Sequence, residues 1–405
     1  MIVLKMEIDN LYMFRDFKID FTYPREIKKT ILQSERVQHA PKIRYKKLNI
    51  MMGGNASGKT TLGKLLCSFQ NYLRGHSGDF FFKKYKKDDN STLKILFVEN
   101  EYLFKMEISF DNNTVQEKLK AVKLRKSYNL EKHLELLNKQ KEECVEFSIF
   151  LDQKDVPILS QILKRHFIGT TEMCAYTSFL DIPESQQNYI TYFSYYLSFY
   201  FRFASFTDRS FQPGEIVTDE SLPMVQKLLM MIDNSIAEVR RATSDNVEKT
   251  ESTEENGYYI IFTNGDRVYI DQETPRMIKD NRLSQGTIEA MEISYIINNI
   301  NKYRGTIYLD EQMAYMHTEL SNALILMLVN SVNKLDDVQL FITSHNENIL
   351  NLNVPNHSFT FLKNEKNKVR VINPEKTLQK NDRSLLEYVQ NNYFDSYPDL
   401  EDLGE

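Results

Sequence analysis

The sequence predicts an α/β protein built on a mixed β-sheet flanked by helices, with a helical insertion in the middle of the chain. Three observations support this prediction. An apolar strand leads into a glycine-rich turn and a helix near residue 55, helices and buried strands alternate after residue 281, and helical patterns dominate between residues 126 and 245. Helices that alternate with continuous apolar strands are typical of a sheet covered on both faces.

The N-terminal part of the chain predicts a hairpin, then a strand, then a helix. Hydrophobic and polar residues alternate over residues 1–21, as in two antiparallel strands. Residues 22–46 are rich in basic side chains and predict an irregular insertion before the apolar strand at 47–52. Two strands of a meander follow the helix, up to about residue 125. The helix itself presents one apolar face, made by Leu62, Leu65, Leu66 and Phe69.

The middle of the chain predicts a lid of helices. Residues 126–147 and 221–242 each carry an amphipathic helical pattern, and the polar segment 244–257 predicts a loop. Residues 189–206 contain ten aromatic residues, and eight of them follow helical spacing, which favours the buried face of a lid helix. Tyr195 and Phe201 lie off that face. A surface for a partner or a second copy is the sharper interpretation of these aromatics, and base stacking is a third.

The C-terminal half predicts a hairpin around Asn264-Gly265, followed by loop, helix, strand, helix and strand up to residue 345. We therefore expect four parts. They are the N-terminal half of an α/β head at 1–112, an inserted helical lid at 113–257, the C-terminal half of the head at 258–380, and a helix with an acidic tail at 381–405.

Composition excludes several classes of protein. Of the 405 residues, 41% are hydrophobic and 26% are charged, as in ordinary globular proteins, and neither a membrane span nor a secretory signal is expected. The three widely spaced cysteines form neither a disulfide framework nor a zinc site, which predicts a cytoplasmic protein. A net charge of −5 restricts any nucleic-acid contact to local basic clusters, at 25–47, 83–87 and 118–126.

The segment 53–60, GGNASGKT, matches the pattern G-x-x-x-x-G-K-[ST] between a predicted strand and a predicted helix. Glycines allow successive N–H groups to surround phosphate oxygens, and the helix N-terminus adds partial positive charge. We therefore predict ATP binding, with Lys59 reaching the β- and γ-phosphates and Thr60 giving its hydroxyl to Mg²⁺. The predicted nucleotide-binding residues of this loop are Gly53, Gly54, Asn55, Ala56, Ser57, Gly58, Lys59, Thr60 and Thr61.

A later predicted strand ends in two carboxylates, Asp310 and Glu311. Such a pair is a weak signal alone, but here it follows a phosphate-binding loop in the chain. We predict that Asp310 is the second Mg²⁺ ligand, acting through water, and that Glu311 is the general base that polarises the attacking water. A solvated strand end is the alternative.

Two further segments resemble sequence motifs of a known class of ATPase. Residues 283–287, LSQGT, resemble the signature motif of ABC ATPases, which implies that Ser284 and Gly286 contact the γ-phosphate bound by another subunit. The alternative is that Ser284 only caps the next helix. His345, at the end of the strand VQLFITSH, resembles the switch histidine, which implies a catalytic role beside Lys59 and Glu311. A purely structural histidine is the alternative.

In this order, the motifs resemble those of the OLD-like/AAA_15-type ABC ATPases, relatives of the RecF and Rad50 heads of the SMC branch. The resemblance covers residues 1–112 and 258–395 and implies an ABC-type P-loop ATPase head that forms a homodimer or higher homo-oligomer around shared ATP. Tyr315 departs from the small residue usual in the D-loop, and no glutamine matches the Q-loop. Arg15 is a candidate for contact with adenine.

The spacing of the motifs narrows the expected subclass. Only short helices are predicted between Thr60 and Leu283, so long coiled-coil arms are not expected. Only 60 residues (405 − 345) follow His345, too few for the Toprim nuclease domain of OLD proteins. The chain therefore resembles the stand-alone ATPase subunits of bacterial anti-phage systems of the PARIS, Septu and AbiL type, which implies a separate effector protein, a nuclease or a toxin.

Two other functions stay open. If the basic clusters converge into a groove for DNA or RNA, the chain is a RecF-like DNA-binding repair ATPase. If the Tyr315 departure prevents signalling between subunits, the chain is an ATP-bound scaffold with negligible turnover. The acidic C-terminal end is expected to be a solvated tail, with nucleic-acid imitation or docking of a basic effector as alternatives.

Overall fold

The chain folds into two compact units. One contains residues Met1–Phe201, Tyr303–Asp310 and Asn333–Glu405, and the other contains Arg202–Lys302 and Glu311–Val332. The computed structural model describes residues 1–23, 30–73, 90–110, 114–140, 143–148, 200–203, 219–220, 222–242, 257–271, 283–300, 305–313, 316–365, 368–378 and 384–394. Sheets and helices are mixed, so the predicted α/β class is confirmed.

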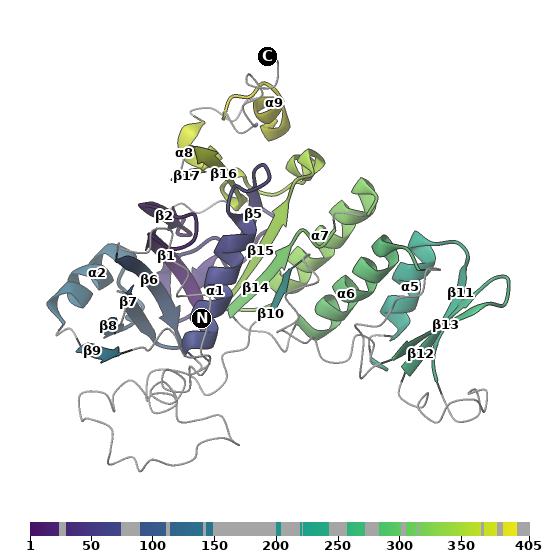
Figure 1. Ribbon diagram of the computed structural model, residues 1–405, viewed down its shortest axis with the longest axis horizontal. Helices are drawn as coiled ribbons and strands as arrows, with labels where there is room; N and C mark the ends of the chain where they lie inside the picture. The colour runs from purple at the N-terminus through teal and green to yellow at the C-terminus, as the bar shows by residue number, and fades with distance from the viewer. Residues whose placement is uncertain are drawn as a thin grey trace, which may run out of the picture. The chain divides into compact units, whose positions relative to one another are not determined.

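An antiparallel sheet of six strands forms one layer of the first unit, in the order β2-β1-β6-β7-β8-β9 (Figure 1). The predicted N-terminal hairpin and the meander after the first helix are both found within it. Its strands are β1 (Ile2–Asp9), β2 (Phe17–Asp20), β6 (Ser91–Glu99), β7 (Tyr102–Phe110), β8 (Thr114–Lys123) and β9 (Glu143–Ser148). The helix α2 (Leu130–Lys139) packs on β7 and β8.

A mixed sheet in the order β10-β14-β15-β5-β16-β17 forms the other layer. The strands β14, β15, β5 and β16 run parallel, and β17 pairs antiparallel with β16. They are β10 (Tyr200–Phe203), β14 (Gly305–Asp310), β15 (Val338–Ser344), β5 (Leu48–Met52), β16 (Phe359–Glu365) and β17 (Lys368–Ile372). Parallel register brings the carboxyl ends of β5, β14 and β15 to one edge.

The helix α1 (Lys59–Leu73) follows β5 after the glycine-rich turn and lies against β14 (Figure 1). The four leucine and phenylalanine side chains predicted for its apolar face are all fully buried. The C-terminal part of this unit adds the helices α8 (Pro374–Thr377) and α9 (Leu385–Gln390) and the short 3-10 helices η5 (Glu347–Asn351) and η6 (Asn356–Ser358).

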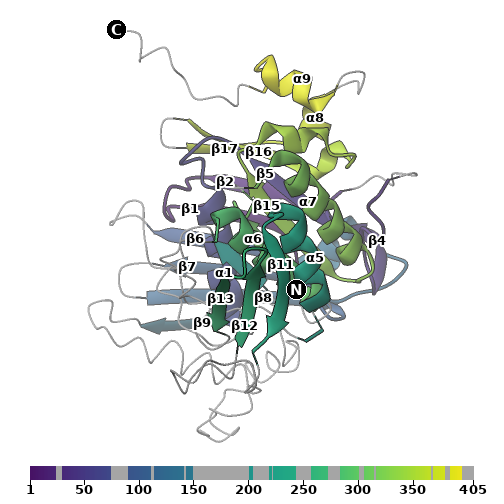
Figure 2. The same cartoon turned by 90° about the vertical axis from the view of Figure 1, so that its right-hand side faces the viewer.

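The second unit combines three helices with a small sheet. The strands β11 (Ile236–Arg241), β12 (Gly257–Phe262) and β13 (Arg267–Asp271) form an antiparallel sheet in that order. The hairpin turn predicted at Asn264-Gly265 joins β12 to β13, with Gly265 at φ +92°. The helices are α5 (Leu222–Ile232), α6 (Gln285–Asn299) and α7 (Thr318–Asn333), and α5 contacts both α6 and β11 (Figure 2).

Three predicted helical or irregular stretches contain strands instead. The helix expected over 126–147 ends at Lys139, and β9 then pairs with β8. The helix expected over 221–242 ends at Ile232, because the Asp233 carboxylate accepts a hydrogen bond from the Ser235 N–H (2.9 Å) and turns the chain into β11. The insertion expected over 22–46 contains the short hairpin β3 (Arg36–Val37) and β4 (Ala40–Arg44).

The aromatic segment 189–206 was expected to be a helix, and its described residues form the strand β10. Phe201 is buried, and its ring stacks on the ring of Tyr308 in β14, with centroids 5.8 Å apart. The segment pairs with the edge of β14 as a strand, although the spacing of its aromatic residues predicts a helix. Phe201, one of the two aromatics that the helical spacing places off the buried face, is therefore a core residue of the sheet.

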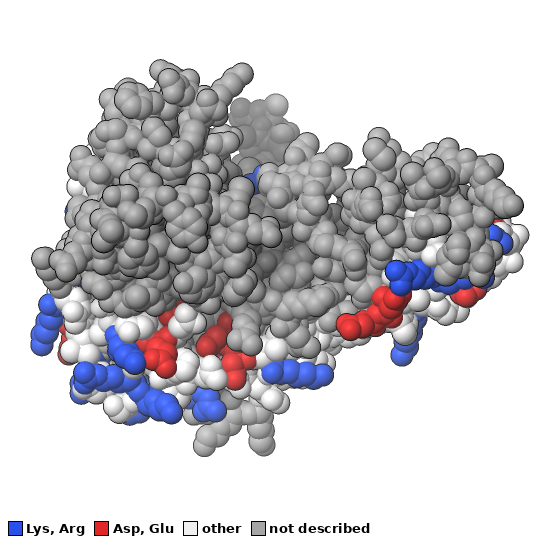
Figure 3. All heavy atoms as spheres, turned by 90° about the horizontal axis from the view of Figure 1, so that it is seen from below, with Lys and Arg blue, Asp and Glu red and all other residues white. Residues whose placement is uncertain are grey.

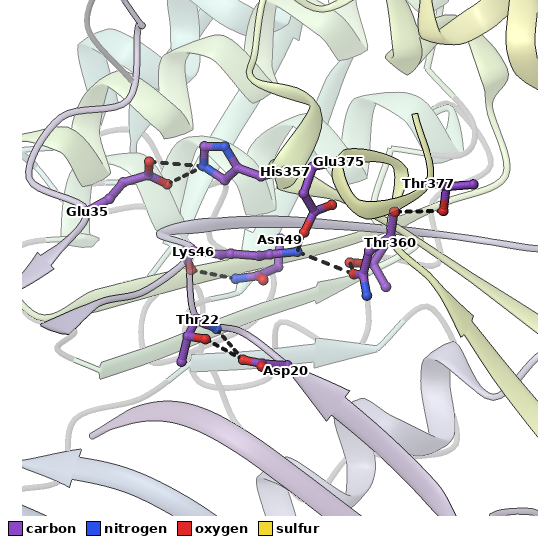
Figure 4. A network of polar contacts seen from close by, with 10 residues as sticks. Asp20, Thr22, Glu35, Lys46, Asn49, His357, Thr360, Glu375 and Thr377 are labelled. Carbon is purple, nitrogen blue, oxygen red and sulfur yellow. Dashed lines mark hydrogen bonds and ion pairs between the residues drawn. The ribbon is translucent and has the colours of Figure 1, made fainter. Parts of the chain in front are cut away.

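The amino ends of the central strands carry a buried polar network (Figure 4). Lys46 and Lys47, directly before β5, are 1% and 0% exposed. The Lys46 ammonium pairs with Glu375 (3.1 Å), and the buried His357 pairs with Glu35 (2.9 Å). Burial lowers the pKa of Lys46, and it lowers the pKa of Lys47 to about 8.

Several predictions fall on residues outside the described part of the chain. They concern Tyr315, the basic cluster at 83–87, most of the aromatic segment, the loop at 244–256 and the acidic tail from Asp395 onward. The four-part division at residues 112, 257 and 380 stays a prediction. Within the described residues, no helix is both long and apolar enough to cross a membrane.

Candidate functional site

The glycine-rich turn connects β5 to α1 with backbone angles that favour glycine. Gly53 has φ +146° and Gly58 has φ +97°, and a side chain at Gly53 would collide with the main-chain oxygen of Leu362 in β16. A Cβ at Gly58 would lie 3.1 Å from the ring of Phe14, in the hairpin between β1 and β2. The loop is therefore held between two neighbouring elements, and its shape depends on glycine.

The other residues of the loop divide by exposure. Asn55 and Ala56 are exposed at its tip, whereas Ser57 and Lys59 are buried. Ala56 has φ +56°, unusual for a residue with a side chain, and its main-chain oxygen accepts a hydrogen bond from Asn364 (3.2 Å). Gly54, Thr60 and Thr61 are half-buried, so the loop combines an open tip with a fixed base.

The ammonium of Lys59 turns back into this loop. Its Nζ donates to the main-chain oxygens of Gly53 (2.8 Å) and Gly54 (3.1 Å), and it lies 3.5 Å from the Ser57 hydroxyl. Main-chain oxygens are weaker partners for an ammonium group than phosphate oxygens. The lysine side chain is thus folded back onto the loop, and a bound phosphate would offer it a stronger partner.

The structure brings together the two predicted metal ligands, which lie 250 residues apart in the sequence. The Thr60 hydroxyl, in the first turn of α1, donates to Asp310 Oδ2 at the end of β14 (2.7 Å). Asp310 is 2% exposed. A hydroxyl and a carboxylate beside a phosphate-binding loop are the oxygen donors that Mg²⁺ prefers in nucleotide sites.

A third member of this cluster was not predicted from the sequence. The hydroxyl of Thr343, near the end of β15, donates to Asp310 Oδ1 (2.7 Å), and Thr343 is itself 2% exposed. A threonine in an otherwise apolar buried strand was the available signal, because a buried hydroxyl needs a partner. Only the register that pairs Asp310 with Thr343 identifies that partner.

Tyr308 is a second residue that the sequence analysis missed. Its hydroxyl donates to the main-chain oxygen of Lys59 (2.7 Å), and its ring lies where a side chain on Gly63 would be. A glycine inside a helix costs about 1 kcal/mol relative to alanine. Gly63 is therefore explained by the tyrosine ring packed against α1 at this point.

Glu311 follows Asp310 directly, is half-buried and has φ +53°. A non-glycine residue in this region of backbone space is strained, and strained residues cluster at functional sites. His345 comes two residues after Thr343 and is exposed, just beyond the end of β15. Both predicted residues therefore follow strands that end at the same edge as β5.

The predicted signature segment lies in the second unit. Ser284 caps α6, since its hydroxyl accepts a hydrogen bond from the Thr287 N–H (3.1 Å) and lies 2.7 Å from the Thr287 hydroxyl. Gly286, in the first turn, is buried. The capping role is thus found, and it leaves Ser284 exposed at a helix N-terminus, the kind of place where anions bind.

The residues present fit ATP with Mg²⁺. Lys59 and the loop N–H groups would provide positive charge for phosphate, and Thr60 and Asp310 would provide oxygen donors for the metal. Among the described residues, no group of three or more His, Cys, Asp or Glu side chains could hold a metal ion alone. A metal here would therefore take its remaining ligands from nucleotide and water, as Mg²⁺ usually does.

Comparison with known proteins gives a structural likeness and no sequence relative. No protein-family model and no curated protein matches this sequence. An Smc head domain with a coiled coil and joint from Pyrococcus yayanosii matches with a TM-score of 0.45 and 8% identity, over 96% of this chain and 99% of that one. The SMC head domain from Thermotoga maritima matches with a TM-score of 0.38 and 11% identity, over 92% and 99%.

A third match is the Smc head domain bound to the C-terminal domain of ScpA, from Pyrococcus furiosus. Its TM-score is 0.43 at 9% identity, over 96% of this chain and 99% of that one. At this level of similarity, the function has to be inferred from the residues of the site itself.

Proposed function

We propose that this chain is an ABC-type ATPase that binds ATP with Mg²⁺ and hydrolyses it. The observation that carries the proposal is the bond from Thr60 in the phosphate-binding loop to Asp310, at the edge where β5, β14 and β15 end. Bound Mg²⁺ would neutralise charge on the phosphates. Lys59 binds and orients the phosphate chain, and Glu311 accepts a proton from the attacking water.

Nucleotide titration and phosphate release test this proposal. Lys59→Ala should lower ATP affinity at least a hundredfold, because the loop then has no cation for the phosphates. Glu311→Gln should bind ATP as the wild type does but release almost no phosphate. If the wild-type protein binds no ATP, the proposal is wrong. If wild type and Glu311→Gln both bind ATP with equally negligible turnover, the chain is an ATP-bound scaffold.

We further propose that two copies bind ATP between them, head to tail, with the N-terminus of α6 closing the site of the other copy. The position of Ser284 at an exposed helix N-terminus supports this idea. Ser284→Asp keeps a good cap but places a negative charge toward the phosphate, and Ser284→Asn keeps the cap without the charge. ATP-dependent dimerisation can be measured by light scattering in the Glu311→Gln background, which should keep ATP bound. In that background, the Ser284→Asn protein should still form dimers with ATP, and the Ser284→Asp protein should not.

The finer role that we propose is the sensor or scaffold subunit of a bacterial anti-phage system, controlling a separate nuclease or toxin. The described helices have at most 16 residues, which supports a compact head over a long-armed one. Co-purification with the product of the adjacent gene, with and without ATP, tests this role. Failure to retain that protein in either state argues against it.

A basic surface favours the alternative of a RecF-like DNA-binding ATPase. Lys105 and Lys120 face each other across β7 and β8, and Lys118 is directly opposite Glu107, which also pairs with Lys94 (3.1 Å). Figure 3 shows Lys and Arg side chains gathered on the side where Figure 1 draws α2 and β8. Opposed lysines are unfavourable unless an anion lies near them.

Charge reversal tests the DNA-binding alternative. If it is correct, wild-type protein binds DNA with a steep dependence on salt, and Lys105→Glu with Lys120→Glu abolishes binding. Lys368→Glu, on β17, is the matched control, because Lys368 is exposed and pairs with Asp16 elsewhere in the unit. Equal DNA binding by both variants would reject this surface.

A further inference from the structure

Asp310 is held by a hydroxyl on each side. Thr60 donates to Oδ2 from α1, and Thr343 donates to Oδ1 from β15, both at 2.7 Å. Hydrogen bonds to a charged group contribute about 1.5–3 kcal/mol, more than those between neutral groups. The carboxylate plane is therefore defined by two donors that come from different elements.

The two hydroxyls differ in what else they can do. Under the proposed function, Thr60 gives its oxygen to Mg²⁺, whereas Thr343 belongs to a strand outside the phosphate-binding loop. The rotation of an Asp carboxyl about χ2 is broad, so a donor to its second oxygen restricts it further. We propose that Thr343 is a positioning residue that fixes the Asp310 carboxylate in the orientation needed for Mg²⁺. This inference rests on the proposed function.

The placement of Thr343 also links two parts of the site. Parallel pairing places Thr343 beside Asp310, and His345 follows two residues later on the same chain segment. The residue that bonds to Asp310 and the predicted switch histidine therefore lie on one short segment. The strand interior leaves little freedom, because Thr343 and Asp310 are both 2% exposed.

The test separates a positioning role from a structural one through Mg²⁺. Thr343→Val removes the hydroxyl with little change of shape, and Thr343→Ser keeps it. Thr306→Val is the matched control, because Thr306 is a buried threonine of β14 whose hydroxyl accepts a 2.7 Å hydrogen bond from Gln70. For each protein, ATP binding is titrated against Mg²⁺, ATP affinity is measured in EDTA, and thermal unfolding is followed.

We expect Thr343→Val to raise the Mg²⁺ concentration for half-maximal ATP binding by about three- to tenfold, with ATP affinity in EDTA unchanged. Thr343→Ser should resemble wild type, and Thr306→Val should lose stability without a change in Mg²⁺ dependence. If Thr343→Val does not fold, Thr343→Cys replaces it, since a thiol is a weak donor of similar size. The Mg²⁺ concentration needed for half-maximal ATP binding should then be higher for Thr343→Cys than for wild type, and unchanged for Thr343→Ser.

Two outcomes overturn the inference, and they are distinguishable. If wild type binds ATP in a Mg²⁺-dependent way and Thr343→Val has the same Mg²⁺ dependence, the positioning role is wrong while the proposed function stands. If wild type binds no ATP at all, the proposed function fails and the inference fails with it.

Discussion

Charged side chains have different partners at the two edges of the central sheet. At the carboxyl edge, Lys59 bonds to main-chain oxygens and Asp310 bonds to hydroxyls, and the loop tip stays exposed. At the amino edge, Lys46 and His357 are paired with carboxylates of their own unit (Figure 4). Under the proposed function, the charged groups at the first edge bind the ligand, whereas those at the second edge form ion pairs within the chain.

Under the proposed function, this difference separates a binding edge from a structural edge. Charges that are buried and paired within the chain contribute to the integrity of the fold, and removing one partner is costly because the other stays buried. The hydrogen bonds that Lys59 makes to main-chain oxygens can be exchanged for bonds to a phosphate under the proposed function. Changes at the amino edge should therefore alter stability and spare ATP affinity, and changes at the carboxyl edge should do the reverse.

The largest expected effect is at the amino edge. Glu375→Gln removes the carboxylate that neutralises Lys46, which is 1% exposed, and should lower the free energy of unfolding by about 3 kcal/mol. Urea denaturation measures this loss. Asp16→Asn is the control, because its ion pair with Lys368 is exposed and should contribute little to stability. A large change in ATP affinity with Glu375→Gln would contradict the separation of the two edges.

The next prediction is that the free energy of unfolding depends on pH through Lys47, which also lies at the amino edge. Burial lowers the pKa of Lys47 from 10.5 to about 8, so between these values the unfolded chain binds a proton that the folded chain does not. Stability conferred through this group is therefore lowest below pH 8 and increases as the pH rises. The gain between pH 7 and 10 is about 2 to 3 kcal/mol.

Urea denaturation of wild type and Lys47→Met over this range checks the prediction, since the mutant should lack that increase. Measurements end at pH 10 because burial raises the pKa of Tyr45 well above its ordinary value, and ionisation of the unfolded chain opposes folding beyond that point. A difference between the two proteins that is independent of pH would show that Lys47 is not the titrating group.

At the carboxyl edge, Gly58→Ala should weaken ATP binding about tenfold or more. The added Cβ must adopt φ +97° and lie 3.1 Å from the Phe14 ring, and this strain costs on the order of 1–3 kcal/mol and distorts the loop. Isothermal titration with ATP measures the loss. Gly265→Ala is the control, since Gly265 has φ +92° and open space around it, but lies in a hairpin of the second unit.

The smallest effect is expected for Tyr308→Phe, which removes one hydroxyl. The hydrogen bond to the Lys59 main-chain oxygen is lost, and both stability and ATP affinity should fall by about 1 kcal/mol. Denaturation and ATP titration measure the two quantities. Unchanged ATP affinity would mean that the first turn of α1 is positioned without this bond.

The course of the chain through this edge was largely predictable from its sequence. The loop pattern at 53–60, its place between a strand and a helix, and the buried helix face all follow from local rules, and the structure confirms those elements. The strand that ends in Asp310 was predictable because a continuous apolar run indicates a strand buried on both faces. The middle of the chain was less predictable, since pairing with a sheet edge turned helical patterns into β9, β10 and β11.

The sequence by itself thus determined which chemical groups are present and which turn matches a phosphate-binding pattern, because glycine spacing and apolar periodicity act over a few residues. The tertiary structure alone decided that Thr343 bonds to Asp310, that Tyr308 explains Gly63, and that Lys46 and His357 pair with Glu375 and Glu35 at the opposite edge. These partners are separated by tens to hundreds of residues. Strand order and register bring them together, and no local pattern encodes either one.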